Sequence, residues 1–155
     1  MLHRNINKFL IYISHKNRIM CLDMGVKFIG IALSDTTQLI AMAHSVYHRR
    51  NLSKDLGYLN KIFKASKSSA MVIGIPLEMS GQENEWCRTI IKFANKIIIK
   101  YKIHIYLQDE SFSTALAIRM LKITSISSTK SKKIDDKISA CIILQRALDT
   151  MNSIR

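Results

Sequence analysis

Short runs of consecutive apolar residues alternate along this chain with longer segments in which apolar residues recur every three or four positions. Runs of the first kind predict strands buried on both faces, and segments of the second kind predict amphipathic helices. We expect strands over residues 18–23, 28–34, 39–47, 70–75 and 103–108. We expect helices after Ser53, after the Ser80–Glu83 capping box, over 114–121 and from Asp135–Asp136 onward.

The order of these elements predicts the fold class. Three successive strands, the first two joined by a turn at residues 24–27, predict an antiparallel part of the sheet. The later strand–helix–strand connections predict a parallel part. We therefore expect an α/β fold with a mixed five-stranded sheet and helices on both faces. The length of 155 residues suits one domain, which we assign to 18–150 after a basic N-terminal extension, 1–17, expected to fray.

The helices are expected to bury one face each. The second predicted helix carries a stripe of Trp86, Ile90, Phe93, Ala94, Ile97 and Tyr101. The last carries Ile138, Cys141, Ile142, Gln145 and Leu148 at helical spacing. Between them, residues 122–134 are rich in Ser, Thr and Lys and predict a mobile basic loop.

Charge indicates the class of partner. With 24 Lys and Arg against 11 Asp and Glu, the net charge is +13, which favours a polyanion such as nucleic acid. No apolar run is long enough for a transmembrane helix, so no membrane partner is expected. The three cysteines are widely spaced and form no CxxC pair, which argues against a Cys-rich zinc site and favours reduced thiols in the cytoplasm.

The few acidic residues fall at informative positions. Asp23 ends one predicted strand, the Asp109–Glu110 pair follows another, and Asp135–Asp136 opens the last helix. Ligands bind at strand ends in α/β sheets. Carboxylates converging there would repel one another unless they held a cation, and oxygen ligands of this kind select Mg²⁺ or Mn²⁺. Two such ions can support phosphodiester hydrolysis.

Ordinary structural roles compete with this interpretation. Asp135 or Asp136 can serve as a helix cap, and Asp109–Glu110 can be a solvated strand exit. Asp23 is harder to explain in that way, because a carboxylate within an apolar run is expensive to bury.

Four segments together resemble one protein family. They are LDMGVKFIGIA (22–32), IGIPLEMSG (73–81), DESFST (109–114) and DKISACIIL (136–144). In order and spacing they are similar to motifs of the YqgF family, Holliday-junction-resolvase-like proteins described as nucleases of precursor 16S ribosomal RNA. The resemblance implies an RNase H-like fold and carries over Asp23, Glu110 and Asp136 as catalytic, metal-binding carboxylates for Mg²⁺ or Mn²⁺. Two family arginines are replaced, by Phe28 and Ser111.

The function expected from this resemblance is metal-dependent cleavage of structured RNA, as in 5′-end processing of precursor 16S ribosomal RNA. We expect Lys27, Gly25, Lys132 and Lys133 to contact the substrate, and ribosome precursors to be partners. A junction resolvase acting on branched DNA and a non-catalytic RNA-binding assembly factor remain alternatives. An actin-like ATPase would need two domains of this kind.

Overall fold

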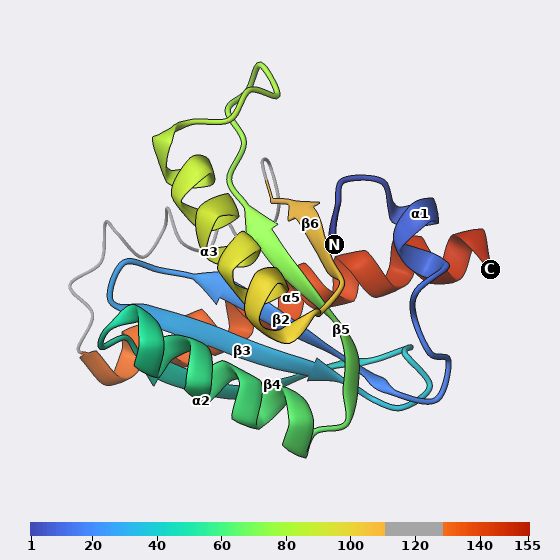
Figure 1. The fold of residues 1–155 in the computed structure, drawn as a ribbon, viewed down its shortest axis with the longest axis horizontal. Coiled ribbons are helices and arrows are strands. Elements are labelled where there is room, and N and C mark those ends of the chain that lie inside the picture. Colours follow the sequence, from blue (N-terminus) through green and yellow to red (C-terminus); the bar gives the residue numbers. More distant parts are fainter. Residues whose placement is uncertain (111–128) are drawn as a thin grey trace.

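The fold is a mixed sheet of six strands with helices on both faces (Figure 1). The computed structural model describes residues 1–110 and 129–155, with the backbone alone for 129–135. The strands are β1 (Leu2–His3), β2 (Arg18–Met24), β3 (Phe28–Ser34), β4 (Ala41–His48), β5 (Ser68–Ile75) and β6 (Ile105–Asp109). Their order across the sheet is β1-β6-β5-β2-β3-β4. The pairs β2–β3 and β3–β4 are antiparallel and the other pairs are parallel, as the order of elements predicts.

Two hydrophobic clusters lie on opposite faces of this sheet. The helices are α1 (Ile6–Leu10), α2 (Leu52–Ala65), α3 (Glu85–Tyr101) and α5 (Thr129–Ile154). The larger cluster packs α2 and α3 against one face, and the smaller packs α1 and α5 against the other. Along β2, Met20 and Leu22 belong to the larger cluster, whereas Ile19 and Cys21 belong to the smaller. This alternation means that the next odd-numbered residue, Asp23, continues the face covered by α5.

The N-terminal residues are part of the folded core. Leu2 and His3 pair in parallel with Ile105 and Tyr106 of β6, and Phe9 of α1 is fully buried. The expectation of a frayed N-terminus is therefore wrong, and the predicted five-stranded sheet lacks this sixth, edge strand. The pairing joins segments a hundred residues apart and involves two residues only, so no local pattern could indicate it.

Asparagines, not the predicted serines, begin two helices. The side chain of Asn51 accepts a hydrogen bond from Lys54 N, and that of Asn84 accepts one from Cys87 N. The predicted cap at Ser53 and the capping box at Ser80–Glu83 are therefore wrong. Asparagine is as good an N-cap as serine, and one cap is enough for each helix.

The long C-terminal helix departs from expectation in its start and in its buried face. Its described part spans Thr129–Ile154, so residues 129–134 of the predicted loop are helical, while 122–128 and the predicted helix 114–121 lie outside the described residues. The α3 stripe is confirmed, but the side of α5 that is most deeply buried is formed by Ala140, Ile143, Leu144, Ala147, Leu148 and Met151. Apolar residues occur on several sides of α5, and its small alanines decide which side approaches the sheet.

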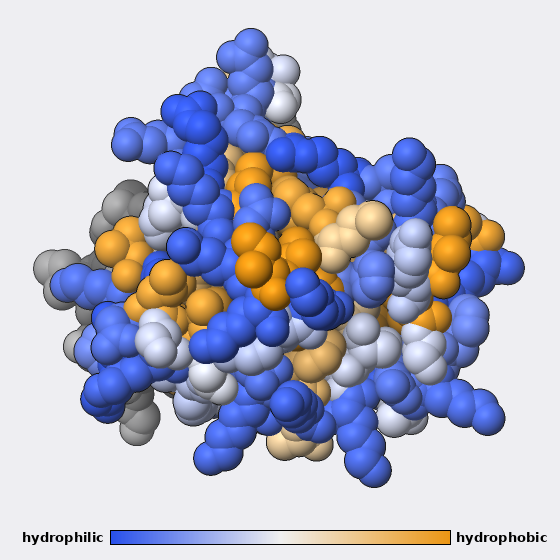
Figure 2. All heavy atoms as spheres, viewed as in Figure 1, coloured by the Kyte–Doolittle hydropathy of each residue, from blue (hydrophilic) through white to orange (hydrophobic). Residues whose placement is uncertain are grey.

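The surface is mostly hydrophilic on the face drawn in Figure 2, with apolar residues gathered over α3. Within residues 1–110 and 129–155, no helix combines the length and apolar character needed to span a bilayer.

Replacing Phe9 tests whether the N-terminal segment stabilises the domain. Phe9→Ala empties a fully buried site and should lower the free energy of unfolding by about 3–5 kcal/mol. Ile11→Ala, two residues away and 77% exposed, should change it by about 0.5 kcal/mol or less. Urea unfolding of both variants measures the difference, and equal midpoints would contradict the integration of this segment into the core.

Candidate active site

Asp23 lies near the end of β2, in the interior of the sheet. It pairs with Gly30 of β3, and β5 runs along the other side of β2. Its residue surface is only 3% exposed. Ile19 and Cys21 pack beneath α5, and Asp23 is the next residue of β2 on that face. A carboxylate therefore follows two apolar side chains in a buried position, where its charge is costly to desolvate.

Glu110 approaches the same place from β6. Its backbone N–H donates to the carbonyl of Ile75 at 3.0 Å, which fixes its position beside the end of β5. Its side chain lies over Gly74, where an added Cβ would be 3.3 Å from Glu110 Oε2. Leu22 of β2 pairs with Ile73, so the register sets Asp23 beside Gly74. Asp23 and Glu110 thus occupy adjoining positions on the face beneath α5.

Asp136 comes to this face on α5, which crosses the sheet at Gly30. An added Cβ on Gly30 would overlap the backbone carbonyl of Asp136 and would lie 3.5 Å from Cβ of Ala140. The helix backbone therefore touches the strand residue that pairs with Asp23. Three carboxylate residues from three separate elements are brought to one end of the α5-covered face.

The residue types at this end fit a divalent cation. Aspartate and glutamate supply the hard oxygen donors that Mg²⁺ and Mn²⁺ prefer. Within the part of the chain that the structure describes, no three His, Cys, Asp or Glu side chains are close enough together to form a complete ligand set. The metal site therefore stays a prediction, and binding at it would require the side chains to turn toward a common ion.

Burial makes Glu110 an unusual acid. Desolvation, reinforced by the neighbouring charge of Asp109, raises the pKa of Glu110 to about 7. The pKa of the Cys21 thiol is also raised well above its ordinary value, first by burial and then by the nearby charge of Glu110. Negative charge is therefore disfavoured on this face in the absence of a cation.

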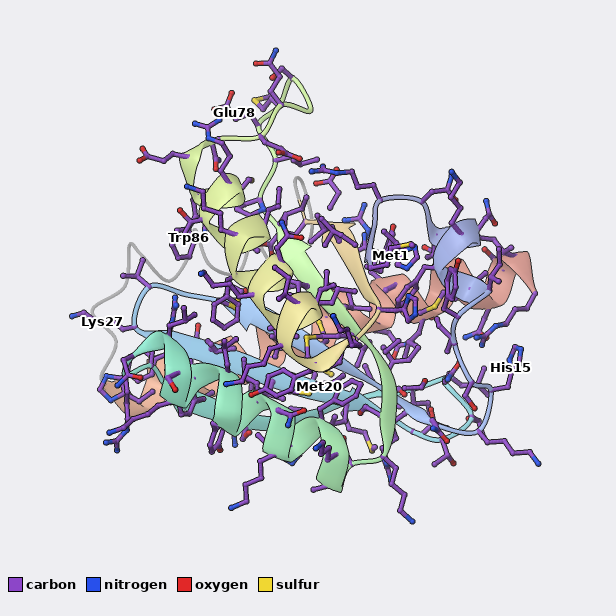
Figure 3. The ribbon with its side chains drawn as sticks, in the orientation of Figure 1. Met1, His15, Met20, Lys27, Glu78 and Trp86 are labelled. Carbon is purple, nitrogen blue, oxygen red and sulfur yellow. The ribbon has the colours of Figure 1, made fainter. Side chains whose placement is uncertain are left out.

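The β2–β3 turn lies at the same end of the sheet and carries two predicted substrate contacts. Gly25 N–H donates to Phe28 O at 2.9 Å, and a Cβ on Gly25 would lie 2.5 Å from that oxygen. The turn itself therefore requires a glycine here. Lys27 is exposed at the tip (Figure 3). Phe28, which replaces a family arginine, stacks on His48 with ring centroids 4.9 Å apart.

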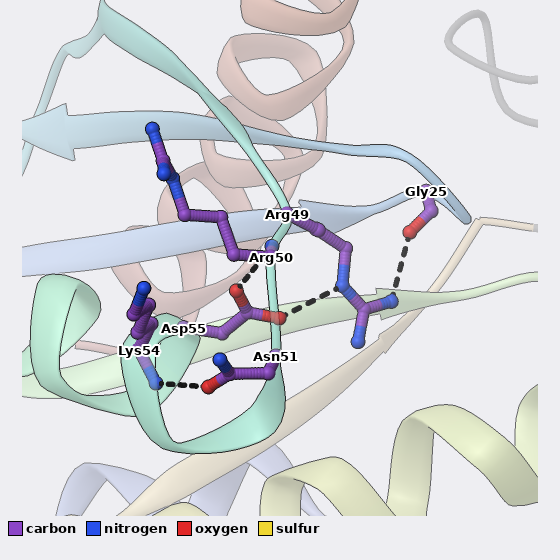
Figure 4. A network of polar contacts seen from close by, with 6 residues as sticks. All are labelled: Gly25, Arg49, Arg50, Asn51, Lys54 and Asp55. Atoms are coloured by element: carbon purple, nitrogen blue, oxygen red, sulfur yellow. Dashed lines mark hydrogen bonds and ion pairs between the residues drawn. The ribbon is translucent and has the colours of Figure 1, made fainter.

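An ion pair between the partly exposed Arg49 and the buried Asp55, which the sequence did not indicate, holds this turn (Figure 4). Arg49 donates to the carbonyl of Gly25 at 3.1 Å and to Asp55 at 3.2 Å. Asp55 is 2% exposed and also accepts from Arg50 N. Arg49 thereby ties the turn to the first turn of α2, and we assign it a positioning role. In the sequence, the only sign of this contact is Asp55 in the first turn of α2. An acid at that position predicts a favourable interaction with the helix dipole and does not indicate Arg49 as its partner.

The remaining predicted residues lie where side chains are not described. Lys132, Lys133 and Asp135 belong to the first turns of α5, for which the structure describes the backbone alone. Ser111 lies outside the described residues.

Known proteins similar to this chain agree with the fold and with the expected class of enzyme. Residues 17–150 match the family model described as "RuvX: Holliday junction resolvase". A protein of Wolbachia pipientis wMel is 70% identical over 155 residues, covering 100% of both chains, and one of Ehrlichia ruminantium (strain Welgevonden) is 53% identical over 149 residues, covering 96% of each. Both are named "Putative pre-16S rRNA nuclease".

A solved structure supports the fold. Thermus thermophilus RuvC in complex with a Holliday junction substrate matches with a TM-score of 0.50 at 10% identity, covering 86% of this chain and 94% of that one. The RNase H-like fold expected from the sequence is therefore confirmed, with six strands in place of five.

The raised pKa of Glu110 predicts a pH-dependent effect of Glu110→Gln on stability. The folded state holds the proton more tightly than the unfolded state, whose glutamate titrates near 4.5, so the parent loses stability as pH rises from about 4.5 to 7. In chelator, the variant's advantage in free energy of unfolding should grow by about 2–3 kcal/mol between pH 5 and pH 8. Urea unfolding at both pH values measures it, with exposed Glu78→Gln as the control. A difference in free energy of unfolding that does not change with pH would contradict the raised pKa of Glu110.

Proposed function

The chain belongs to the RuvX family of Holliday junction resolvases, and from that membership we propose that this nuclease hydrolyses phosphodiester bonds of structured RNA at the Asp23, Glu110 and Asp136 site. The observation that carries the proposal is that Asp23 and Glu110, both almost fully buried, occupy adjoining positions beneath α5, which touches the sheet at Gly30 and Gly74. Buried acids gathered in a chain of net charge +13 suit a site that neutralises them with cations and attracts phosphates.

The carboxylates have the role of holding Mg²⁺ or Mn²⁺. A bound divalent ion would polarise the scissile phosphate and lower the pKa of a water nucleophile. Asp23 would supply one oxygen donor from a strand that pairs with neighbours on both sides. Glu110 must lose its proton to bind an ion, and its pKa of about 7 makes that step sensitive to pH in the neutral range.

Basic groups around the site would position the substrate. Lys27 is exposed on the turn held by Arg49, and we assign it the role of a point charge toward a phosphate near the site. We assign Lys132 and Lys133 the same role, as the sequence suggests. Binding of this kind depends mainly on phosphates and therefore weakens with salt.

We assign precursor 16S ribosomal RNA as the substrate, because that is the RNA named for the curated relatives. Ribosome precursors would then be partners. Three free cysteines and such a substrate favour the cytoplasm. Branched DNA remains a second candidate, since the family is described by its junction resolvases.

Cleavage assays test the site and the substrate together. A fragment spanning the 5′ end of precursor 16S ribosomal RNA and a four-way DNA junction are each incubated with Mg²⁺, Mn²⁺ or chelator. We expect cleavage of the RNA with metal only. Asp23→Asn and Glu110→Gln should each lower the rate about 100-fold or more while binding is retained, because each change keeps the shape and removes a charge. Glu78→Gln should cleave like the parent.

Two results would contradict the proposal in different ways. Cleavage by Asp23→Asn at the parent's rate would remove that residue from the site. Cleavage of the junction but not of the RNA would leave the nuclease assignment in place and replace its substrate.

A further inference from the structure

A groove of about 960 Å³ lies at the opposite end of the sheet from the carboxylates. It is formed where β2 begins, β3 ends and the C-terminal half of α2 passes β4. Arg18 in its lining and Asp23 are on the same strand, separated by roughly 17 Å at 3.3 Å per residue. The start of β2 and the β2–β3 turn lie at opposite ends of the molecule in Figure 1. The groove also lies on the α2 side of the sheet, since Leu33 of its lining packs in that cluster.

The lining combines positive charge with apolar surface. Its cations are Lys16, Arg18, Lys61 and Lys67. Its apolar side chains include Leu33, Met42 and Ile62. Among the described residues that line the groove there is no Asp or Glu. Arg18 is held in place by a hydrogen bond to the carbonyl of Ser34 at 3.0 Å. This chemistry complements a ligand that is anionic on one side and apolar on the other.

Tyr58 gives the groove an aromatic side chain that is fixed from behind. It is 37% exposed, and its ring stacks on Tyr47 with centroids 4.2 Å apart and planes 17° apart. Tyr47 is only 8% exposed, so it supports the stack from the core. A fixed aromatic ring beside cations is the arrangement on which unpaired bases stack while their phosphates meet positive charge.

We propose that this groove binds a single strand of nucleic acid, with a base on Tyr58 and phosphates on Lys16, Lys61 and Lys67. This proposal takes from the proposed function only the class of ligand, nucleic acid. Binding of a strand in this groove does not require that the protein cleave it. A duplex fits the groove less well, because its bases are already stacked on one another and cannot pack against Tyr58 or the apolar side chains of the lining. An acidic peptide would use the lysines but has no planar bases for Tyr58.

Binding of a short fluorescent oligouridine, followed by anisotropy, tests the role of the ring. Tyr58→Leu keeps an apolar side chain but removes the stacking face, and should weaken binding about five- to hundredfold. Tyr58→Phe keeps the ring and should bind like the parent. Oligothymidine in a parallel arm tells whether the groove prefers RNA. Equal affinity of Tyr58→Leu and the parent would overturn the proposal.

Two matched pairs of charge changes test the location. Lys16→Gln with Lys61→Gln removes two charges from the groove, and Lys92→Gln with Lys96→Gln removes two exposed charges from α3. The groove pair should reduce the slope of log affinity against log salt by about 1.4, at about 0.7 for each phosphate contact in a single strand. The α3 pair should change it little. Equal effects of the two pairs would show general attraction to a basic surface and would overturn the proposal.

Failure of the groove and failure of the nuclease assignment give different results. Asp23→Asn should bind oligouridine like the parent, and Tyr58→Leu should still cleave a substrate that has no single-stranded extension. A parent that binds oligouridine through Tyr58 but cleaves nothing supports the groove and contradicts the nuclease site. Displacement of oligouridine by oligoglutamate as readily as by unlabelled oligouridine would overturn the proposal, because the groove would then recognise charge alone.

Discussion

The close approach of α5 to the sheet at Gly30 and Gly74 is the contact on which the candidate site depends. At Gly30 the helix backbone occupies the space of a side chain, and at Gly74 the Cδ1 atom of Ile143 would be 2.8 Å from an added Cβ. Alanines on both partners, including Ala32 and Ala140, continue this narrow interface. Larger residues on these strands would lift the helix and with it Asp136. Asp23 and Glu110 lie on the face that α5 covers and are almost fully buried, so this packing desolvates both carboxylates.

That burial opposes stability when no cation is present. With a pKa of about 7, Glu110 still holds part of its proton at neutral pH, where a glutamate of the unfolded chain is ionised. This difference lowers the free energy of unfolding at neutral pH. Such local conflicts with folding are expected at functional sites, where the residues serve binding or chemistry. The Arg49–Asp55 pair, in which only Asp55 is buried, shows the opposite case, since the two charges compensate each other and the pair secures a turn. The two clusters of charge thus have opposite effects on stability at neutral pH.

Local patterns predicted the parts of the fold that local physics determines. The buried strand runs, the hairpin at Gly25 and the apolar stripe of α3 are all visible over a few residues. The pairing of β1 with β6, the buried face of α5 and the Arg49–Asp55 contact depend on residues far apart in the chain or on competing local choices. For the site, the sequence indicated which acids follow strands, and the family resemblance selected Glu110 over Asp109. Only the structure relates them to Gly30 and Gly74.

The central claim is that Asp23, Glu110 and Asp136 form one cation site beneath α5, and thermal unfolding in a Mn²⁺ titration tests it most directly. At free metal about 100 times the dissociation constant, a folded-state site adds about 2.7 kcal/mol. For a domain of this size, that raises the melting temperature by roughly 5–11 °C. The account predicts this rise for the parent and little rise for Asp23→Asn or Asp136→Asn, with Asp23→Asn melting no lower than the parent in chelator. A parent that does not respond to millimolar Mn²⁺, or variants that respond as strongly as the parent, would contradict it.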